Sequence, residues 1–213
     1  MSGKEHLLSM QDICKSFPGV KALDGAHLDL KKGSVHALMG ENGAGKSTLM
    51  KCLFGVYSPD CGRILLDDKE VLFKNPKEAL LGGVAMVHQE LNQAAKLSVS
   101  HNMWLGRFPL VSPFLPFTND KKMHEMTASV LEELGIDVDP RVKMMTLSVS
   151  KRQMVEIAKA VSYNARVLVL DEPTSSLSIK EAEKLFAIID LLKKRGVGII
   201  YISHKNGGDP TDL

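Results

Sequence analysis

The chain has 213 residues and a mass of 23.3 kDa, which is room for one domain, with or without a small additional lobe. Hydrophobic residues make up 44% and charged residues 24%, a globular composition that excludes a disordered chain. With 27 basic and 25 acidic residues the net charge is only +2, which is too balanced to indicate a nucleic-acid-binding protein.

The sequence shows no membrane-spanning or export signal. No apolar run approaches the roughly 18 residues of a transmembrane helix, and the opening MSGKEHLLSMQDICKSF lacks the apolar centre of a signal peptide. The cysteines (Cys14, Cys52 and Cys61) are odd in number and lack metal-ligand spacing. These features favour a soluble protein in a reducing cytosol.

The first part of the chain predicts short strands around a glycine-rich loop. An apolar run ends at Gly40 and helical spacing begins after Lys46, which indicates a strand, a loop and a helix in succession. The polar turn DDKE between two apolar segments suggests a hairpin. The expected strands cover residues 6–13, 26–30, 35–39, 63–66, 71–73 and 84–87.

From about Asn92 to Tyr163 the pattern predicts a helical insert. It begins with a proline-rich stretch whose later half we expect to be a loop. A helix follows in DKKMHEMTASVLEELG, with Asp120 as its expected N-cap and Gly135 as its C-cap, and VSKRQMVEIAKAVSYN predicts a second helix. The single tryptophan, Trp104, belongs either to a docking surface or to the buried core of this insert.

The last third of the chain predicts a strand, a helix and a second strand. Val167–Leu170 and Gly198–Ser203 are almost entirely apolar, and the charged amphipathic segment IKEAEKLFAIIDLLKKRG lies between them. Fully apolar strands joined through a helix indicate a parallel sheet that is covered on both faces.

The segment GENGAGKST fits the phosphate-binding pattern G-x-x-x-x-G-K-[ST] through Gly40, Gly45, Lys46 and Ser47. Glycines let backbone N–H groups approach phosphate oxygens, and the helix that follows offers its positive end to the same ligand. Lys46 would add a full charge, and the Ser47 hydroxyl can complete a Mg²⁺ shell. The expected nucleotide-binding residues of this loop are Gly40, Glu41, Asn42, Gly43, Ala44, Gly45, Lys46, Ser47 and Thr48.

A pair of carboxylates, Asp171 and Glu172, follows the apolar strand VLVL. Alone, such a pair is usually the solvated end of a strand. Behind a phosphate loop and on a parallel strand, Asp171 is expected to hold Mg²⁺, because this ion prefers carboxylate oxygen. Glu172 is the expected general base for an attacking water.

Taken together, the motifs resemble ABC-transporter ATPase domains. The loop at Gly40, Gln89 after VAMVH, the segment LSVSKRQ, LDEPTSSLS and His204 occur in the order of that family, from about Leu7 to Lys205. The phrases FPGVKAL, VHQELN, NMWLGR, VEIAKA and DEPTSSL further resemble the first nucleotide-binding domain of bacterial monosaccharide importers of the galactose/methyl galactoside type.

The resemblance implies an α/β fold: a P-loop NTPase (RecA-like) core with an N-terminal antiparallel β-subdomain and a helical insert at about 92–163. The nucleotide-binding domain would cover 1–205 and be incomplete at its C-terminus, with 206–213 as a tail outside the family pattern. These importers carry two such domains in one chain, so the resemblance predicts a truncated first half.

The resemblance also implies roles for single residues. Phe17 would stack on adenine, Gln89 would sense Mg²⁺ or the attacking water, and His204 would contact the γ-phosphate and hold the water in line with Glu172. Ser148 would contact the nucleotide bound by a second domain.

The chain departs from the family in that contact segment. Where the family has LSGGQ, this chain has Leu147, Ser148, Val149, Ser150 and Lys151. Val149 and Ser150 add side chains where glycine lets the backbone approach phosphate, so the site completed by this segment is expected to be looser. In the loop that crosses to the second domain, Ser178 stands where many members have Asp.

The implied activity is ATP hydrolysis with ATP and Mg²⁺ as cofactors, coupled to import of a monosaccharide. The implied partners are integral-membrane permease subunits, a second nucleotide-binding domain or a second copy of the chain, and indirectly a periplasmic sugar-binding protein, with no nucleic acid. The implied location is peripheral, on the cytoplasmic face of the bacterial inner membrane.

Other classes remain open at this level. A soluble ABC ATPase uncoupled from transport would share the ATP motifs, although the compact insert and balanced charge speak against it. A P-loop kinase would need an acceptor pocket and no Gln89. An ATP-binding fragment without turnover is the third alternative, because transition-state donors would come from two domains.

Overall fold

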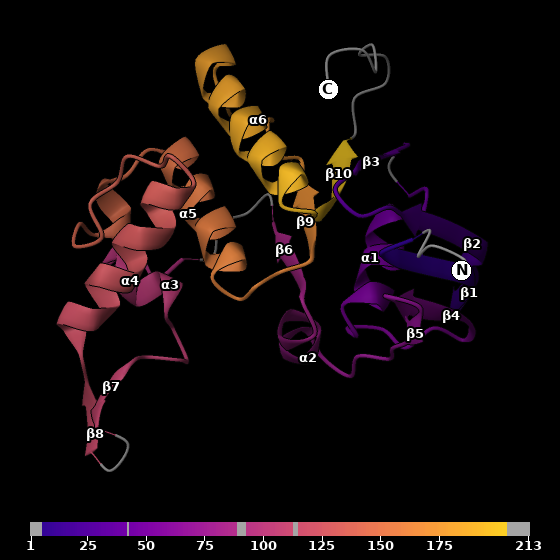
Figure 1. Ribbon diagram of the computed structural model, residues 1–213. Helices are drawn as coiled ribbons and strands as arrows, with labels where there is room; N and C mark the ends of the chain where they lie inside the picture. Colours follow the sequence, from indigo (N-terminus) through magenta and orange to yellow (C-terminus); the bar gives the residue numbers. More distant parts are fainter. Residues whose placement is uncertain (1–5, 42, 89–92, 113–114, 204–213) are drawn as a thin grey trace.

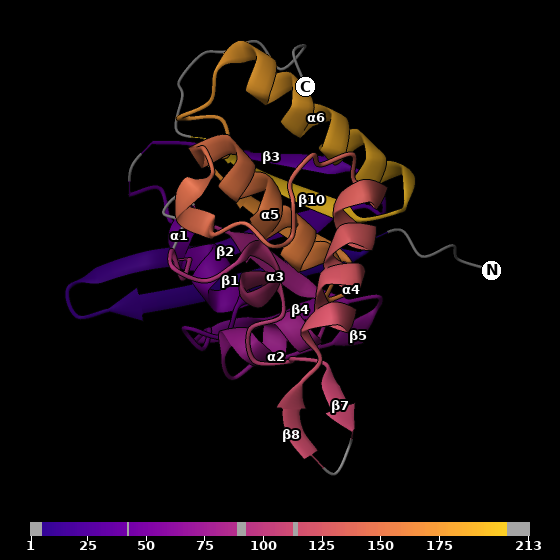
Figure 2. The same ribbon diagram turned by 90° about the vertical axis from the view of Figure 1, so that its left-hand side faces the viewer.

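The computed structural model describes residues 6–41, 43–88, 93–112 and 115–203. The described residues form a four-stranded parallel sheet, a four-stranded antiparallel sheet, a two-stranded hairpin and a group of helices (Figures 1 and 2). The strands are β1 (Leu8–Phe17), β2 (Val20–Leu30), β3 (Val35–Met39), β4 (Cys61–Leu66), β5 (Lys69–Glu70), β6 (Val84–Val87), β7 (Leu110–Ser112), β8 (Leu115–Thr118), β9 (Val167–Asp171) and β10 (Gly198–Ser203). The helices are α1 (Lys46–Leu53), α2 (Pro76–Leu81), α3 (Val99–Met103), α4 (Asp120–Glu133), α5 (Val149–Val161) and α6 (Ile179–Lys194), with a 3₁₀ turn at Met144–Thr146.

The parallel sheet has the strand order β3-β10-β9-β6. Strand β10 lies between β3 and β9, with Tyr201 opposite Ala37 on one side and Leu170 on the other. The carboxyl ends of β3, β6, β9 and β10 therefore lie at one edge of the sheet. That edge carries the predicted phosphate loop and the predicted carboxylates.

Side chains of β9 alternate between two apolar cores. Val167 and Val169 pack with β1, β2, β4 and α1, whereas Leu168 and Leu170 pack with α3, α4, α5 and α6. All four are essentially inaccessible to solvent, because the sheet is covered on both faces. In Figure 1 helices α3, α4 and α5 lie to the left of the parallel sheet, and the antiparallel sheet with α1 lies to its right. The expected architecture of a parallel core, an antiparallel subdomain and a helical insert is therefore confirmed.

The antiparallel sheet has the order β2-β1-β4-β5. Cys14 on β1 lies opposite Cys61 on β4, and a disulfide joins them, while Cys52 is a buried free thiol. The odd number of cysteines, interpreted as typical of a reducing cytosol, did not predict this disulfide. The two cysteines are far apart in sequence, and the register of β1 and β4 brings them together.

The predicted hairpin around DDKE is shorter than expected. Asp67 and Asp68 both have positive φ angles, 51° and 63°, so the chain reverses within these two residues. The return strand β5 is therefore Lys69–Glu70, and the predicted strand at 71–73 does not form.

The N-cap of α4 also differs from the expectation. Asn119, not Asp120, caps this helix, since the Asn119 side-chain oxygen accepts from Lys122 N at 3.0 Å.

The proline-rich part of the insert differs most from the expectation. Instead of a loop it holds β7 and β8, an antiparallel hairpin that extends away from the body of the molecule (Figures 1 and 2). Trp104 is a buried anchor: only 7% of it is exposed, and its Nε1 donates to Thr127 Oγ1 at 2.9 Å. Within the described residues, no helix is both long and apolar enough to cross a bilayer.

Candidate functional site

The glycine-rich loop connects β3 to the start of α1. Lys46 opens the helix, is 94% inaccessible, and its Nζ donates to Gly40 O at 2.5 Å and to Glu41 O at 2.9 Å. The chain thereby folds the loop around its own lysine, with the N-terminus of α1 directed at the same space. Asn42 lies outside the described residues.

Gly45 is needed for this turn. Its φ is 85°, in the left-handed region, and a Cβ would lie 2.8 Å from Ala22 O and 2.9 Å from Leu23 Cδ2. Any side chain here would press on β2, so the glycine lets the loop pack directly against that strand.

A pocket of about 410 Å³ joins the loop to the hairpin of β1 and β2. Phe17 lines it together with the loop, as the resemblance implied, and the Phe17 ring is held edge-on against Tyr57 with centroids 5.1 Å apart. Sequence reasoning missed the neighbours Val20, Lys21 and Ala22, which also line the pocket. The turn-forming residues after Phe17 could have identified them, because in the resulting hairpin Val20 lies opposite Phe17.

A second pocket, of about 420 Å³, brings Ser47 together with Asp171. Ser47 is the second residue of α1 and Asp171 the last residue of β9, so elements far apart in sequence supply two hard oxygen ligands to one space. Among the residues that the structure describes, no group of three or more His, Cys, Asp or Glu side chains is gathered. Two protein oxygens beside a phosphate site fit Mg²⁺, which usually retains water and phosphate ligands. His88 lines this pocket as well and was not anticipated.

Glu172 follows Asp171 in a left-handed backbone conformation, with φ 46°. Its amide donates to Ile202 O of β10 at 3.1 Å, and its carbonyl accepts from Ser175 Oγ at 3.0 Å. A non-glycine residue at positive φ is uncommon and is typically held by its surroundings. The sheet and the following turn thus fix the backbone that carries the predicted base.

The other predicted residues are distributed as follows. Gln89 and His204 lie outside the described residues. Ser148 is exposed and caps α5, and it lines a pocket of about 400 Å³ that has no residue in common with the Phe17–Lys46 pocket. The structure therefore brings Phe17, the loop, Ser47 and Asp171 to one region and leaves Ser148 on a different one.

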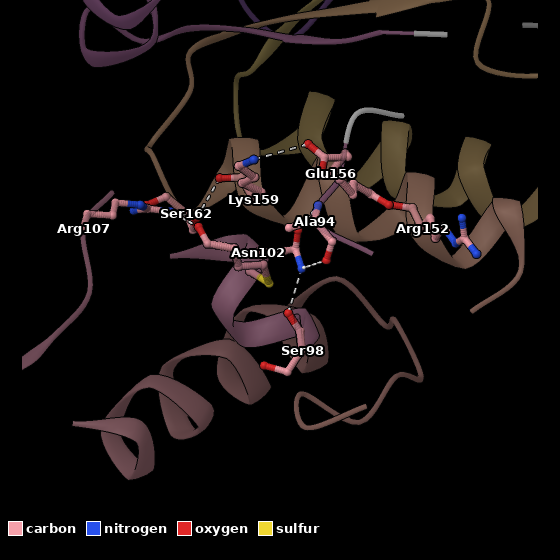
Figure 3. Close-up of polar contacts among 10 residues, drawn as sticks. Ala94, Ser98, Asn102, Arg107, Arg152, Glu156, Lys159 and Ser162 are labelled. Carbon is pink, nitrogen blue, oxygen red and sulfur yellow. Dashed lines mark hydrogen bonds and ion pairs between the residues drawn. The ribbon is translucent and has the colours of Figure 1, made fainter. Parts of the chain in front are cut away.

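The residues just before α3, beginning at Gln93, are held to the helical insert by side-chain hydrogen bonds. Gln93 Nε2 donates to Arg152 O and to Glu156 Oε1, both at 2.9 Å. The side chain of Asn102 receives a hydrogen bond from Ala94 N and donates to Ala94 O and Ser98 O (Figure 3). This network was not predicted, because nothing in the local pattern distinguishes these amides.

Comparison with known sequences gives the family. Residues 23–175 match the family model described as ABC transporter. The chain is 61% identical over 199 residues to the galactose/methyl galactoside import ATP-binding protein MglA of Haemophilus influenzae, covering 93% of this chain and 39% of that protein. It is 58% identical over 205 residues to the protein of the same name from Clostridium perfringens, covering 96% and 39%. The chain thus spans about two fifths of the length of these relatives.

Solved structures with the same fold are also ABC cassettes. A nucleotide-free ATP-binding cassette from an ABC transporter matches with a TM-score of 0.81 and 28% identity, over 94% of this chain and 82% of that one. The ADP conformation of MJ1267, an ATP-binding cassette of an ABC transporter, matches with a TM-score of 0.80 and 27% identity, over 95% and 82%. The expected P-loop NTPase fold is therefore confirmed. Since the family model covers well over half of the 213 residues, the chain belongs to the ABC transporter family.

Proposed function

We propose that the chain binds MgATP on the loop Gly40–Thr48 and hydrolyses it to energise import of a monosaccharide. The observation that carries the proposal is the buried Lys46 at the start of α1, with Phe17 in the pocket on one side and Ser47 and Asp171 in the pocket on the other. A nucleotide laid across the loop would place its base at Phe17 and its terminal phosphates at Lys46.

The roles within the site follow from its chemistry. Lys46 and the backbone N–H groups at the start of α1 would neutralise charge on the phosphates. Ser47 and Asp171 would hold Mg²⁺, which supplies further positive charge to the transferring phosphoryl group. Glu172 would orient and deprotonate the attacking water, aided by Gln89 and His204, both outside the described residues.

The substrate and partners follow from the relatives' names. Both relatives are named as galactose/methyl galactoside import ATP-binding proteins, so we assign this chain to a galactose-type sugar importer. Its partners would be permease subunits in the membrane, with a periplasmic sugar-binding protein acting indirectly. It would be peripheral on the cytoplasmic face of the membrane.

A second cassette, or a second copy of the chain, would supply the other half of the catalytic site. Ser148 lines a different pocket from Lys46, which supports the proposal that Ser148 contacts the nucleotide of that second cassette and not its own.

Replacing Lys46 tests the proposal directly. Lys46→Ala should weaken MgATP binding by about 10- to 100-fold, because a charge-assisted contact to phosphate is lost. Isothermal titration calorimetry on the 213-residue chain measures this, with circular dichroism to establish that the variant is folded. Lys122→Ala, on the exposed surface of α4, is the matched control and should bind as wild type does. Unchanged affinity in a folded Lys46→Ala variant would refute the assignment of the site.

A further inference from the structure

One carboxylate joins the N-termini of two helices. Glu181, in the first turn of α6, accepts a hydrogen bond through Oε1 from Ser150 Oγ at 2.5 Å, and Ser150 lies in the first turn of α5. Through Oε2 it accepts from Ser178 N at 3.0 Å and from Ser178 Oγ at 2.8 Å. Helix N-termini attract negative charge, so this carboxylate stabilises both helix starts at once.

The Ser150 hydroxyl points inward. Ser150 is only 5% exposed, whereas Val149 beside it is 50% exposed. Its side chain therefore does not block the outer surface of the helix start. It supplies instead a hydroxyl that glycine, the residue of the family pattern at this position, cannot provide.

The bridge also sets the direction of the next hydrogen bond. An ionised carboxylate only accepts, so Ser150 donates its single proton to Glu181. Ser148 Oγ lies 3.0 Å from Ser150 Oγ, and with the Ser150 proton already used, Ser148 is the donor of that pair. The orientation of the Ser148 hydroxyl thus depends on Glu181.

The same helix start is tied to the turn that follows the carboxylates of β9. Gln153 Nε2, one helical turn after the start of α5, donates to Pro173 O at 2.7 Å. Ser175 N donates to Glu172 O at 3.2 Å, and the turn then runs into Ser178. The turn from Pro173 to Ser178 is therefore held to α5 at both ends, by Gln153 and by the Glu181 bridge.

We propose that Glu181 is a positioning residue, which fixes the first turn of α5, and with it Ser148, relative to the turn that follows Glu172. The hydrogen bonds of Glu181 to Ser150 and Ser178 matter for activity only under the proposed function, in which Ser148 and Glu172 act on nucleotide. Ser150 is the second member of the bridge and makes the connection specific to α5.

Local amide exchange tests the bridge without requiring turnover. Glu181→Gln should raise exchange rates about tenfold or more in the first turns of both α5 and α6, because charge-assisted hydrogen bonds are lost on both sides. Ser150→Ala should raise them in α5 alone, since the bonds from Ser178 remain. Glu183→Gln, an exposed neighbour on α6, is the control and should change neither segment. Equal behaviour of Glu181→Gln and Glu183→Gln, or a rise in α6 only, would overturn the proposal.

A pH profile separates the charge from a merely steric role. Hydrogen bonds from Ser150 and then from Ser178 lower the pKa of Glu181 from 4.5 to about 2. The other charged side chains that line its pocket are Lys184 on α6, Lys151 on α5 and Asp137 in the segment after α4. Because the pKa of Glu181 is lower in the folded than in the unfolded protein, its ionised carboxylate stabilises the fold at pH values above the unfolded pKa of 4.5. This stabilisation is lost as the pH falls from 4.5 towards 2. The difference in melting temperature between wild type and Glu181→Gln should therefore shrink over that range. A difference that does not change with pH would contradict a role for the charge.

Nucleotide binding distinguishes this inference from the proposed function. Glu181→Gln, Ser150→Ala and Ser150→Gly should all bind MgATP at the Lys46 site within about twofold of wild type, since these residues line a different pocket. If Lys46→Ala leaves binding unchanged, the proposed function fails, while the exchange and pH results still decide whether the bridge exists. If Lys46→Ala abolishes binding and the exchange results are negative, only the bridge fails.

Discussion

Two glycines of the phosphate loop have the same backbone angle but different surroundings. Gly43 and Gly45 both have φ 85°, yet a Cβ at Gly43 would meet nothing within 4 Å, whereas one at Gly45 would meet Ala22 O and Leu23. The sequence motif marks Gly45 as fixed and Gly43 as variable. The structure supplies the physical reason, which is contact with β2 rather than conformation alone.

This difference predicts unequal costs for alanine. Gly43→Ala should cost about 1 kcal/mol, the usual penalty for a side chain at positive φ. Gly45→Ala should cost about 1–3 kcal/mol more, because the added methyl group forces β2 to shift. Urea unfolding of the two variants measures both values. Equal losses of stability would show that contact with β2 does not constrain the loop.

Some residues of the site were predictable and others were not. Lys46, Ser47 and Asp171 were predicted from sequence because a short contiguous motif marks each of them, whereas Phe17 came only from the resemblance to the family. Glu181 was not predicted, since a glutamate three residues after a serine at a helix start predicts only a local cap. Its contact with Ser150 depends on the packing of α5 against α6, which no local pattern records.

At the scale of elements, one amide side chain of α3 helps to hold the residues just before that helix, together with Gln93. Asn102 in α3 is 3% exposed, and its side chain satisfies both the N–H and the C=O of Ala94 and also bonds Ser98 O. Residues 93–98, the part of this segment that the structure describes, form no named strand or helix. Hydrogen bonds from the side chain of Asn102 thus help to fix backbone that no regular strand or helix holds in these described residues.

Asn102→Ala should therefore destabilise the protein by about 1–3 kcal/mol, because the half-buried N–H of Ala94 loses its partner, whereas Ala94 O still accepts from Leu97 N. The Ala94 amide should also exchange faster. Asn119→Ala, which removes the cap of α4 on an exposed surface, is the comparison and should cost only about 1 kcal/mol. Thermal and urea unfolding provide the values, and an Asn102→Ala cost no larger than that of Asn119→Ala would argue against the role of this amide.

The elements that were predicted best are the buried strands. β3, β6 and β10 were placed at their exact bounds, because a short, continuously apolar run between breakers has few other structures available. Helices α2 and α3 were missed, since six and five residues are too few to show a period. The hairpin of β7 and β8 was missed because its prolines favour a loop.

At the scale of the whole molecule, the hairpin of β7 and β8 extends away from the rest of the structure (Figure 2), and several of its apolar side chains are exposed. Leu110 is 45% exposed, Val111 59% and Phe117 65%. Such side chains add little to folding stability, because they bury almost no area. They do favour association between molecules.

The double variant Val111→Thr/Phe117→Ser should accordingly keep its unfolding free energy within about 0.5 kcal/mol of wild type. Static light scattering during concentration should show less self-association. Met145→Ser, which alters a 55% exposed side chain elsewhere, is the control and should scatter as wild type does. If scattering is unchanged in the double variant, the surface that causes self-association lies outside the hairpin.

The position of β10 between β3 and β9 constrains how the protein is made. During synthesis β3 leaves the ribosome long before its partner β10, and at about 5–20 residues per second the delay is roughly 10–30 seconds. For that time the apolar edge of β3 has no strand to pair with, although β1, β2 and β4 can already assemble. The four-stranded parallel sheet of β3, β10, β9 and β6 therefore closes only when residues 198–203 emerge, and the loops at its carboxyl edge cannot be fully positioned before then.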